Sequence, residues 1–552
     1  MRSKSQQATM NGAAPPRVES TEILVVGGSL GGVACALAAL RKGRRVILTE
    51  EFEWLGGQLT SQAVPPDEHQ WVEQFGVTRS YRQLRNLIRD FYRDHYPLTD
   101  VARQNPELNP GAGTVSRLCH EPRVAVAVID ALLQSFQAGG QLVVYRRTKP
   151  VSADMNGDHV RAVTFCELGA GGQHFTVSAS FTIDATELGD LLPLTDTEYV
   201  TGFESRKNTG EPSSPDEAQP DNQQAFSVCF AVDHVEGDHT ILKPESYDYW
   251  RNFQPKFWGG PLVGLRSPEP RTLKPTDRTF TPNPNDDPQD VRGDHVRGGS
   301  DLDLWVFRRI AARNNFRPES YRSDICLVNW PMIDYFKAPV IDVSDEQYQE
   351  RVKEAAGLSY SMLYYLQTEA PRPDGGKGFP GLRLRGDITG TNHGLAMAPY
   401  FRESRRIKAV TTIVEQDVSL KIRGAAGPAH YEDSVGIGMY RIDLHPSTGG
   451  DNYIDVGSCP FEIPLGALIP VKRPNLLAGC KNIGTTHITN GCYRLHPVEW
   501  NIGEVAGLIA AHCYDRGLSP QQVQADTALF ARFKQELDAA GIETKWPDIR
   551  GY

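Results

Sequence analysis

Residues 22–50 read EILVVGGSLGGVACALAALRKGRRVILTE, and the order of residue types in this stretch predicts its fold. The apolar run 22–26 is typical of a buried strand, and the Ala- and Leu-rich run 33–42, closed by Gly43, is typical of a helix. A second apolar run, 45–49, ends at Glu50. The stretch therefore predicts a βαβ unit, in which two parallel strands are joined by a crossing helix.

The glycine-rich turn between the first strand and the helix has the spacing of a dinucleotide-binding turn. Such a turn needs a glycine for the tight bend, a small residue where the backbone approaches the pyrophosphate, and a glycine for close helix–strand packing. Gly27, Ser29 and Gly32 occupy these places, with serine at the second glycine position. The pyrophosphate is expected at the helix N-terminus and the ribose hydroxyls at Glu50. The alternative is a glycine-rich turn in an ordinary βαβ unit.

Several stretches resemble one family. The run 25–33, Glu50 and the run LGGQLT at 55–60 are similar to the FAD-dependent oxidoreductases of the glutathione-reductase-like (GR2-type) fold. Within these, the sequence looks like bacterial members of largely unassigned substrate. The stretches 183–186, 402–406 and 477–507 resemble later parts of the family, although Glu187 stands where glycine is usual. The resemblance covers residue 21 to about residue 517, and it implies FAD as cofactor without naming a substrate.

The resemblance also implies the residues that contact FAD. They are Gly27, Gly28, Ser29, Leu30, Gly31, Gly32, Glu50, Glu51, Gly57, Gln58, Ala185, Thr186, Gly479, Asn501, Ile502 and Gly503. The last three have a chemical reason of their own, because N–H groups at a helix N-terminus stabilise the negative charge that a reduced flavin carries. Glycine at 479 and 503 would let the backbone come close to the cofactor.

The expected fold class is α/β, with a Rossmann-like FAD-binding domain (glutathione-reductase-like) and an inserted mixed α/β substrate domain. Composition shifts near residue 201 to long loops rich in Pro, Asp, Asn and Ser, and strands resume near residue 415. The expected units are a disordered tail at 1–20, the FAD-binding domain at 21–200 and 415–517, the inserted domain at 201–414, and a C-terminal helix and tail at 518–552. Further expected elements are helices at 80–92, 122–137, 499–514 and 520–540, strands at 141–145 and 181–186, and an antiparallel meander at 151–177.

Candidate catalytic residues cluster before the last flavin-facing stretch. His487, Arg494 and His496 lie within residues 484–496. A histidine can act as general base for an alcohol or amine, and an arginine can hold a substrate carboxylate bidentately. The alternative is that these side chains pair with one another or with backbone and fix the loop. His445 is a fourth candidate, because the run 441–445 alternates like a strand that places it on one face with Asp443.

Four tryptophans of the middle section, at 250, 258, 305 and 330, can either line a ligand pocket or fill a core, and a core is the commoner use. No metal-binding motif is present, so no metal is expected. The nine cysteines include no C-x-x-C pair, which disfavours a zinc ribbon, an iron–sulfur cluster and a dithiol relay.

The charge balance argues against two classes of partner. The formal net charge is −10, whereas nucleic acids and anionic membrane surfaces require a basic footprint. The apolar run 33–40 is far too short for a membrane span. The polar opening, residues 1–16, lacks the apolar region of a secretory signal, so a cytoplasmic protein is expected.

These observations together predict an FAD-dependent oxidase or dehydrogenase. The sequence has no second glycine-rich βαβ unit for NAD(P)H. The expected partners are therefore a small-molecule substrate, which gives a hydride from an alcohol or amine C–H to flavin N5, and O2 or another electron acceptor. Two alternatives stay open: a flavin-dependent monooxygenase using NAD(P)H and O2, and a non-enzymatic, flavin-stabilised binding module. Covalent attachment of FAD and the oligomeric state are left open as well.

Overall fold

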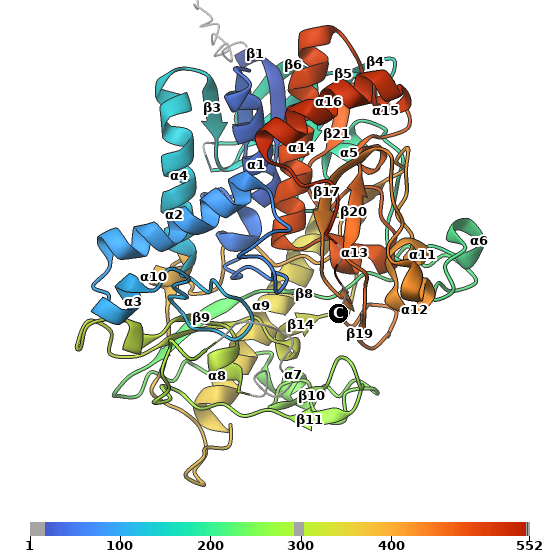
Figure 1. Ribbon diagram of the computed structural model, residues 1–552. Helices are drawn as coiled ribbons and strands as arrows, with labels where there is room; N and C mark the ends of the chain where they lie inside the picture. Colours follow the sequence, from blue (N-terminus) through green and yellow to red (C-terminus); the bar gives the residue numbers. More distant parts are fainter. Residues whose placement is uncertain (1–16, 170, 292–302, 548, 550–552) are drawn as a thin grey trace, which may run out of the picture.

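A mostly parallel sheet carries the glycine-rich turn. The structure, a computed structural model, describes residues 17–169, 171–291, 303–547 and 549. Within them, a seven-stranded sheet has the order β3-β2-β1-β6-β5-β4, with β21 also paired to β6 (Figure 1). The five parallel strands are β1 (Arg17–Val26), β2 (Val46–Thr49), β3 (Leu142–Tyr145), β6 (His174–Asp184) and β21 (Leu476–Ala478). The mixed α/β class and the βαβ unit predicted from residues 22–50 are confirmed.

Two predicted boundaries at this sheet are wrong. Residues 17–20, expected in a disordered tail, are the first residues of β1, because β6 offers them partners beginning with Arg17 opposite Phe175. The strand expected at 181–186 starts earlier, since β6 is continuous from His174 and also closes the antiparallel meander with β4 (Thr148–Asn156) and β5 (His159–Glu167). Residues 1–16 of the expected tail lie outside the described residues.

Helices cover the sheet, and α1 (Leu30–Arg41) and α14 (His496–Arg516) lie side by side (Figure 1). The helices expected at 80–92 and 122–137 are α2 (Arg79–His95) and α4 (Pro122–Ala138). The single helix expected at 520–540 is two, α15 (Pro520–Ala525) and α16 (Thr527–Ala540). The break falls at Asp526, whose side chain accepts from two N–H groups of the first turn of α16 and thereby starts a new helix.

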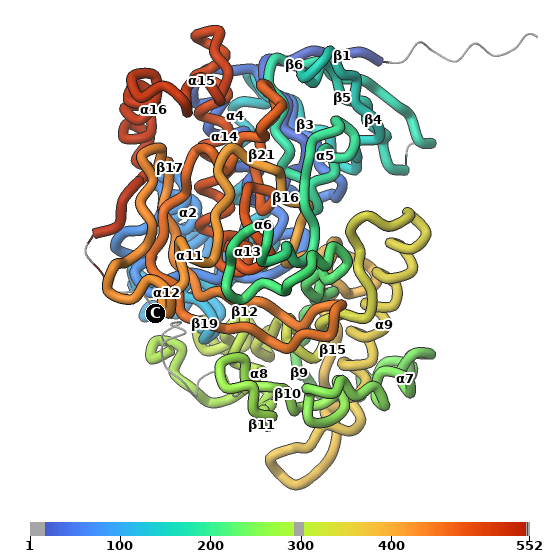
Figure 2. The backbone as a smooth tube through the Cα atoms, turned by 90° about the vertical axis from the view of Figure 1, so that its right-hand side faces the viewer, coloured from blue at the N-terminus to red at the C-terminus, as the bar shows by residue number. Residues whose placement is uncertain are grey.

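A second core lies below the main sheet in Figure 2. It is built on a four-stranded sheet in the order β12-β13-β9-β15 and on the long helix α9 (Asp345–Thr368). The strands are β9 (Phe230–His234), β12 (Arg309–Ala311), β13 (Ile325–Val328) and β15 (Leu382–Leu384). Trp250, Trp258, Trp305 and Trp330 are all buried in this core. Their packing matches the core alternative rather than an open pocket.

Short elements connect the two cores. The helices are α3 (Asp100–Gln104), α5 (Leu191–Leu194), α6 (Arg206–Thr209), α7 (Tyr247–Asn252), α8 (Leu304–Phe307), α10 (Gly386–Thr389), α11 (Glu415–Val418), α12 (Leu420–Arg423) and α13 (His487–Tyr493). The strands are β7 (Tyr199–Val200), β8 (Phe226–Ser227), β10 (Arg266–Pro268), β11 (Pro275–Asp277), β14 (Asp334–Tyr335), β16 (Arg406–Ile407), β17 (Ser434–Gly438), β18 (Ile442–Leu444), β19 (Ile454–Val456) and β20 (Phe461–Pro464). A 3-10 turn, η1 (Gly57–Leu59), follows β2.

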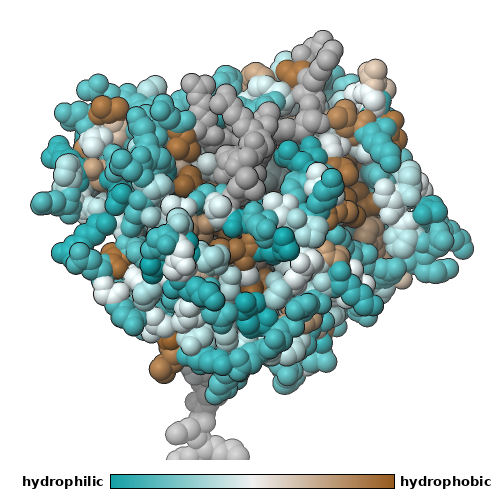
Figure 3. Space-filling model, turned by 90° about the horizontal axis from the view of Figure 1, so that it is seen from below, coloured by the Kyte–Doolittle hydropathy of each residue, from teal (hydrophilic) through white to brown (hydrophobic). Residues whose placement is uncertain are grey.

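The surface has a mixed character. On the face shown in Figure 3, apolar side chains are interspersed among polar ones. Exposed large apolar residues such as Leu242 and Val18 are single side chains of the kind that folded proteins commonly expose. Among the described residues, none of the helices combines the length and the apolar character that crossing a bilayer requires.

Candidate functional site

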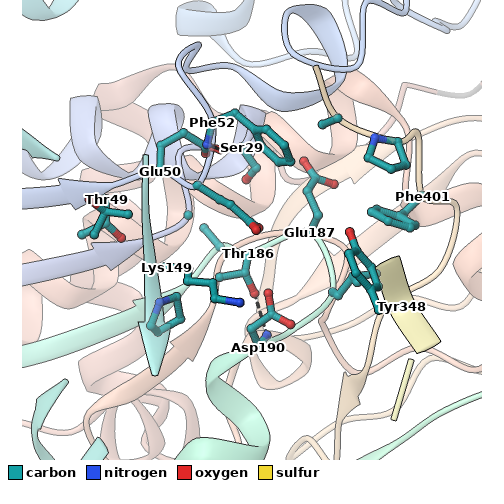
Figure 4. Close-up of a pocket in the computed structure, with 18 residues that line it drawn as sticks. Ser29, Thr49, Glu50, Phe52, Lys149, Thr186, Glu187, Asp190, Tyr348 and Phe401 are labelled. Atoms are coloured by element: carbon teal, nitrogen blue, oxygen red, sulfur yellow. Dashed lines mark hydrogen bonds between the residues drawn. The ribbon is translucent and has the colours of Figure 1, made fainter. Parts of the chain in front are cut away.

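A cavity lies where β1, β2 and β6 end, beside the glycine-rich turn. We call it the turn cavity. Figure 4 shows Glu50, Lys149, Thr186, Glu187 and Tyr348 around this space. Its walls come from the turn, the end of β2, the start of β4, the segment after β6, α9 and the loop around residues 398–401. Stretches far apart in the chain therefore meet at one position.

The first and third positions of the turn have no room for a side chain. A Cβ on Gly27 would overlap the carbonyl oxygen of Ala185, and a Cβ on Gly32 would overlap the carbonyl oxygen of Gly27. Gly27 also has a φ of +97°, which favours glycine. These two glycines therefore hold β1, α1 and the end of β6 in contact. At the second position, Ser29 Oγ accepts from the Gly32 N–H at 3.1 Å and caps α1.

Glu50 lies at the end of β2 and is 7% exposed. Its Oε2 accepts from Gly28 N at 2.7 Å and its Oε1 from Phe52 N at 2.9 Å. Burial raises the pKa of Glu50 to about 8, against the lowering effect of these two hydrogen bonds. The carboxyl group thus lines the turn cavity where the motif expects it. Its contact with a ribose stays a prediction.

The turn cavity suits a polar dinucleotide. Thr49 Oγ1 and Glu187 Oε1 line it and are buried without a hydrogen-bond partner among the described residues. Native proteins rarely leave buried polar atoms unpaired, so these two atoms indicate a polar ligand. Pro150, Tyr348 and Phe401 give the same cavity apolar walls, as an adenine ring requires. The donors, acceptors and apolar walls fit the adenosine part of FAD.

The N-terminus of α1 differs from the expectation, because one of its N–H groups is bonded to a protein side chain. Gly31 N, predicted to face the pyrophosphate, donates to Glu499 Oε1 at 3.1 Å. Glu499 Oε2 also accepts a short hydrogen bond from the Gln58 side chain. Burial raises the pKa of Glu499, while nearby Lys481 opposes that rise. Sequence reasoning missed Glu499, although a carboxylate in the first turn of a buried helix was a usable signal.

The prediction that Asn501, Ile502 and Gly503 lie at a helix N-terminus is wrong. The helix α14 begins at His496, so these residues sit in its second turn, where their N–H groups belong to the helix ladder. Asn501 Nδ2 donates to Val435 O at 3.3 Å, and a Cβ on Gly503 would overlap Gly31 O. Gly503 therefore permits close contact between α14 and α1. The free N–H groups at the true start of α14 are those of residues 496 and 498.

Gly479 also serves packing. It follows β21, and a Cβ on it would come 2.5 Å from Ile183 Cγ2 of β6. The Gly479 carbonyl oxygen in turn occupies the space that a Cβ on Gly31 would need. Together these contacts bring the C-terminal strand against the glycine-rich turn. This close approach is between protein segments, so a direct contact of Gly479 with flavin stays a prediction.

Five residues form what we call the polar cluster: Asp334, Arg402, Asp443, His445 and Arg494. Asp334 Oδ2 is 2.6 Å from His445 Nδ1, and Asp334 Oδ1 is 3.0 Å from an Arg402 Nη. Asp443 Oδ2 accepts from Arg494 at 3.0 Å and lies 3.6 Å from His445 Nε2. Burial alone would raise the pKa of Asp334, but Arg402 and His445 lower it. Asp334 is therefore an ionised partner for the imidazole.

The polar cluster reaches η1 through Tyr400. Arg494 donates to the Tyr400 hydroxyl at 3.3 Å, and this hydroxyl donates to Gln58 Oε1 at 3.3 Å. Gln58 belongs to η1, one of the stretches that resemble the family. The His445 side chain is 16% exposed, whereas the Asp334 side chain is 0% exposed. The imidazole is therefore partly exposed, whereas its carboxylate partner is fully buried.

His487 and His496 have separate partners. The His487 ring stacks on Phe203 with centroids 4.1 Å apart, and its Nδ1 lies 3.2 Å from Glu403. His496 Nδ1 accepts from Asp67 N at 3.0 Å, and burial lowers the pKa of His496 to about 3. A histidine that is neutral and this weakly basic makes a poor general base. Both arrangements favour the alternative that these side chains fix the loop.

One buried side chain escaped sequence reasoning altogether. Gln62 is 0% exposed, and neither its Oε1 nor its Nε2 has a hydrogen-bond partner among the described residues. Its backbone N–H bonds to Gly57 O, so it lies directly after η1.

Within the described ranges, no group of three or more His, Cys, Asp and Glu is placed to hold a metal ion.

A parallel sheet with a glycine-rich turn after its first strand and an acid after its second is the arrangement of a dinucleotide-binding protein. The chain belongs to the FAD dependent oxidoreductase family, because a sequence model of that family matches residues 22–537. The protein is thus an FAD-dependent oxidoreductase, with FAD as its cofactor.

One curated relative is a Bilirubin reductase of Mediterraneibacter gnavus (strain CC55_001C), with 33% identity over 79 residues. The match covers 14% of this chain and 11% of the relative, so it spans about one tenth of that protein's length.

Similar solved structures include three flavin or dehydrogenase enzymes. The flavin-dependent monooxygenase PieE, in complex with FAD and substrate, has 13% identity, covers 71% of this chain and 51% of its own, and gives a TM-score of 0.28. L-proline dehydrogenase from P. horikoshii has 11% identity, coverage of 40% and 62%, and a TM-score of 0.24. The myxobacterial chondrochloren halogenase CndH has 16% identity, coverage of 41% and 45%, and a TM-score of 0.20.

Proposed function

We propose that this enzyme transfers a hydride from an alcohol or amine C–H of a small-molecule substrate to FAD. The observation that carries the proposal is the pair of His445 and Asp334, whose atoms Nδ1 and Oδ2 are 2.6 Å apart. A carboxylate at Nδ1 orients the imidazole and directs Nε2 towards the side of Asp443, whose Oδ2 lies 3.6 Å away. Loss of a hydride from such a C–H requires loss of a proton from the adjacent hydroxyl or amine, which is the task of a general base.

The roles of the residues follow from their contacts. His445 Nε2 accepts the proton of the substrate, and Asp334 is a positioning residue that holds the imidazole and stabilises its charged form. Arg494 and Asp443 lie on the Nε2 side, so they orient the substrate beside the base. FAD, when bound, would supply the hydride acceptor, and O2 or another electron acceptor would be its oxidant.

For the fold, we propose the glutathione-reductase-like (GR2-type) arrangement with an inserted mixed α/β substrate domain at 201–414. Two features support it: β1, β6 and β21 join three distant stretches in one sheet, and a separate core holds the four buried tryptophans. The FAD-binding parts would be 21–200 and 415–517, with the C-terminal helices at 518–552 packed on them.

For the cofactor contacts, we propose that the turn cavity holds the adenosine half of FAD and that η1 and the start of α14 hold the flavin half. Buried polar atoms without a hydrogen-bond partner among the described residues support this placement: Thr49 Oγ1, Glu187 Oε1 and both amide atoms of Gln62. Gly28, Leu30, Glu51, Gly57 and Gln58 would contribute from the turn and the segment after β2, and Ala185 and Thr186 from the segment after β6.

The test is anaerobic reduction of the bound flavin by a panel of alcohols and amines. A substrate should bleach the flavin without NAD(P)H, and His445→Gln should slow the bleaching by about 100-fold or more, the usual contribution of a general base. His430→Gln is a matched control, because His430 also lies 2.8 Å from a carboxylate, that of Glu462, but its side chain is 73% exposed. Equal rates in both variants, or reduction only by NADPH, would contradict the proposal.

A further inference from the structure

Arg308 is a buried cation with few partners. Its side chain is 12% exposed, and its one hydrogen bond among the described residues joins Nη1 to Asp67 Oδ1 at 3.4 Å. Its Nε is buried and has no hydrogen-bond partner in that part of the chain. An arginine carries five N–H donors, and burying a charge is costly unless the charge is paired and hydrogen-bonded.

The free donors lie on one edge of the guanidinium. Nε and Nη2 form the edge that grips a carboxylate with two parallel hydrogen bonds, and the single bond of Arg308 uses Nη1 instead. This edge carries no hydrogen bond from residues 17–169, 171–291, 303–547 or 549. Such a geometry suits an anion that the protein itself does not supply.

In the other two arginines nearby, Nε is likewise buried without a hydrogen-bond partner among the described residues, but Nη2 is already bonded to protein groups. Arg402 bonds to Ala225 O, Ser227 Oγ and the Asn329 side chain, besides its ion pair with Asp334. Arg494 bonds to Tyr400 and to both the side chain and the backbone of Asp443. Arg494, the sequence candidate for gripping a substrate carboxylate, therefore has less capacity for it than Arg308.

Arg308 and Arg494 of the polar cluster have two tyrosine neighbours in common. Both Arg308 and Arg494 are charged neighbours of the Tyr400 and Tyr440 hydroxyl groups. The residue paired with Arg308, Asp67, donates its N–H to His496 at the start of α14. Arg308 thus has tyrosine neighbours in common with the polar cluster and is linked through Asp67 to the start of α14, where we propose the flavin half.

We propose that Arg308 binds a carboxylate of the substrate, so that the enzyme acts on an alcohol or amine that also carries a carboxylate group. This inference rests on the proposed hydride transfer for the reacting end of the molecule. The Nε–Nη2 edge of Arg308 takes the two carboxylate oxygens, and His445 faces the hydroxyl or amine. Arg308 sets specificity, because an uncharged substrate would leave its guanidinium buried and underpaired.

The test uses the holoenzyme and pairs of ligands of nearly equal size in which a neutral amide replaces the carboxylate: acetate against acetamide, and benzoate against benzamide. Binding is measured by the shift of the flavin absorbance and by the rise in Tm. Wild type should bind at least one acid about 10-fold or more tightly than its amide, and Arg308→Gln should lose most of this preference. Arg308→Lys keeps the charge but not the paired N–H donors of the guanidinium edge. Its preference for the acid over the amide should lie between those of wild type and Arg308→Gln. Arg322→Gln removes a charge from an exposed side chain and should change nothing.

The outcomes separate the two proposals. If wild type does not prefer either acid, or if Arg308→Gln keeps the preference, the carboxylate site is wrong whatever the reaction. If the preference depends on Arg308 but no alcohol or amine reduces the flavin, the site stands and the proposed hydride transfer fails. Should Arg308→Gln lose FAD, the comparison of acids with amides in wild type and Arg308→Lys still decides.

Discussion

The backbones of Gly31 in α1 and Gly503 in α14 touch, with the Gly31 carbonyl oxygen in the place where residue 503 would carry a Cβ. The contact continues one turn on, where Gly507 faces the carbonyl oxygen of Cys35 in the same way. Two helices separated by most of the chain therefore approach as closely as two backbones can. Gly31 also belongs to the turn predicted to bind the pyrophosphate, so this contact couples the C-terminal helix to the cofactor site.

Gly503→Ala should push α14 from α1. Overpacking of a tight contact typically costs about 1–3 kcal/mol, and the shift would displace the glycine-rich turn. We expect a lower Tm and a weaker affinity for FAD, measured by thermal unfolding and by flavin release. Gly517→Ala is the control, because position 517 has open space around it and only a positive φ to satisfy. Retained FAD affinity in Gly503→Ala would mean that the turn does not depend on this contact.

Gly27→Ala should abolish FAD binding. Its Cβ would overlap Ala185 O, and the backbone has a φ of +97°, so both space and conformation oppose a side chain. Gly43→Ala separates the two causes, since Gly43 has a φ of +79° but nothing within 4 Å of its Cβ. The control should lose about 1 kcal/mol of stability and keep its flavin. If Gly27→Ala is purified with bound flavin, the turn can bind the cofactor without its close contact to the end of β6.

Glu50→Ala should weaken FAD binding by about 0.5–1.5 kcal/mol, the range of a hydrogen bond between neutral groups, because burial raises the pKa of Glu50 to about 8. Glu50→Gln should lose less, because an amide keeps one oxygen acceptor for Gly28 N or Phe52 N. The dissociation constant of FAD, measured by fluorescence quenching, gives both values. Unchanged affinity in both variants would place the ribose elsewhere.

His496→Asn should make the free energy of unfolding less dependent on pH in the acid range. The pKa of His496 is lowered from 6.5 to about 3, so the folded protein binds fewer protons than the unfolded chain between these values. Stability is therefore lost as the pH falls from 6.5 towards 3, by about 3 kcal/mol at pH 4. Asparagine can still accept from Asp67 N but does not titrate. Urea unfolding at pH 7 and at pH 4 tests this prediction. If the free energy of unfolding falls by the same amount in wild type and variant, the prediction is wrong.

Asp334→Asn should slow flavin reduction while leaving the FAD affinity unchanged. The variant loses the charge that orients His445 and stabilises its protonated form, and Arg402 loses its ion-pair partner. We expect a 10- to 100-fold drop in the reduction rate, within the range of general-base effects, and a shift in its pH profile. A drop in stability alone, with an unchanged pH profile, would assign Asp334 a structural role.

Local pattern predicted much of the main sheet. The run 22–50 folds as expected because each of its elements is defined by residues within it: apolar strands, a capped helix and a glycine turn. The start of β1 at Arg17 was not predicted, since three of the residues 17–20 are polar and the segment becomes a strand only by pairing with β6. Tertiary pairing there overrides a weak local preference.

The candidate site was less predictable, for a physical reason. The sequence placed Arg494 and His445 among the substrate-side candidates, and the structure brings both into the polar cluster. It gave no sign of Asp334, because a buried ion pair is defined by residues far apart in the chain. Arg308 stands out only when its hydrogen bonds are counted, since an unused donor edge leaves no trace in the order of residues.

The contact between α1 and α14 also bears on how the protein is made. During synthesis, α1 leaves the ribosome long before residues 496–516 exist. Its apolar face and the glycine-rich turn therefore lack their packing partner α14 until most of the chain has been made. Contacts of such long sequence separation slow folding, because the loop must close before they form. The nascent chain should therefore acquire FAD only near completion, and a product truncated before α14 should neither bind flavin nor escape chaperones and proteases.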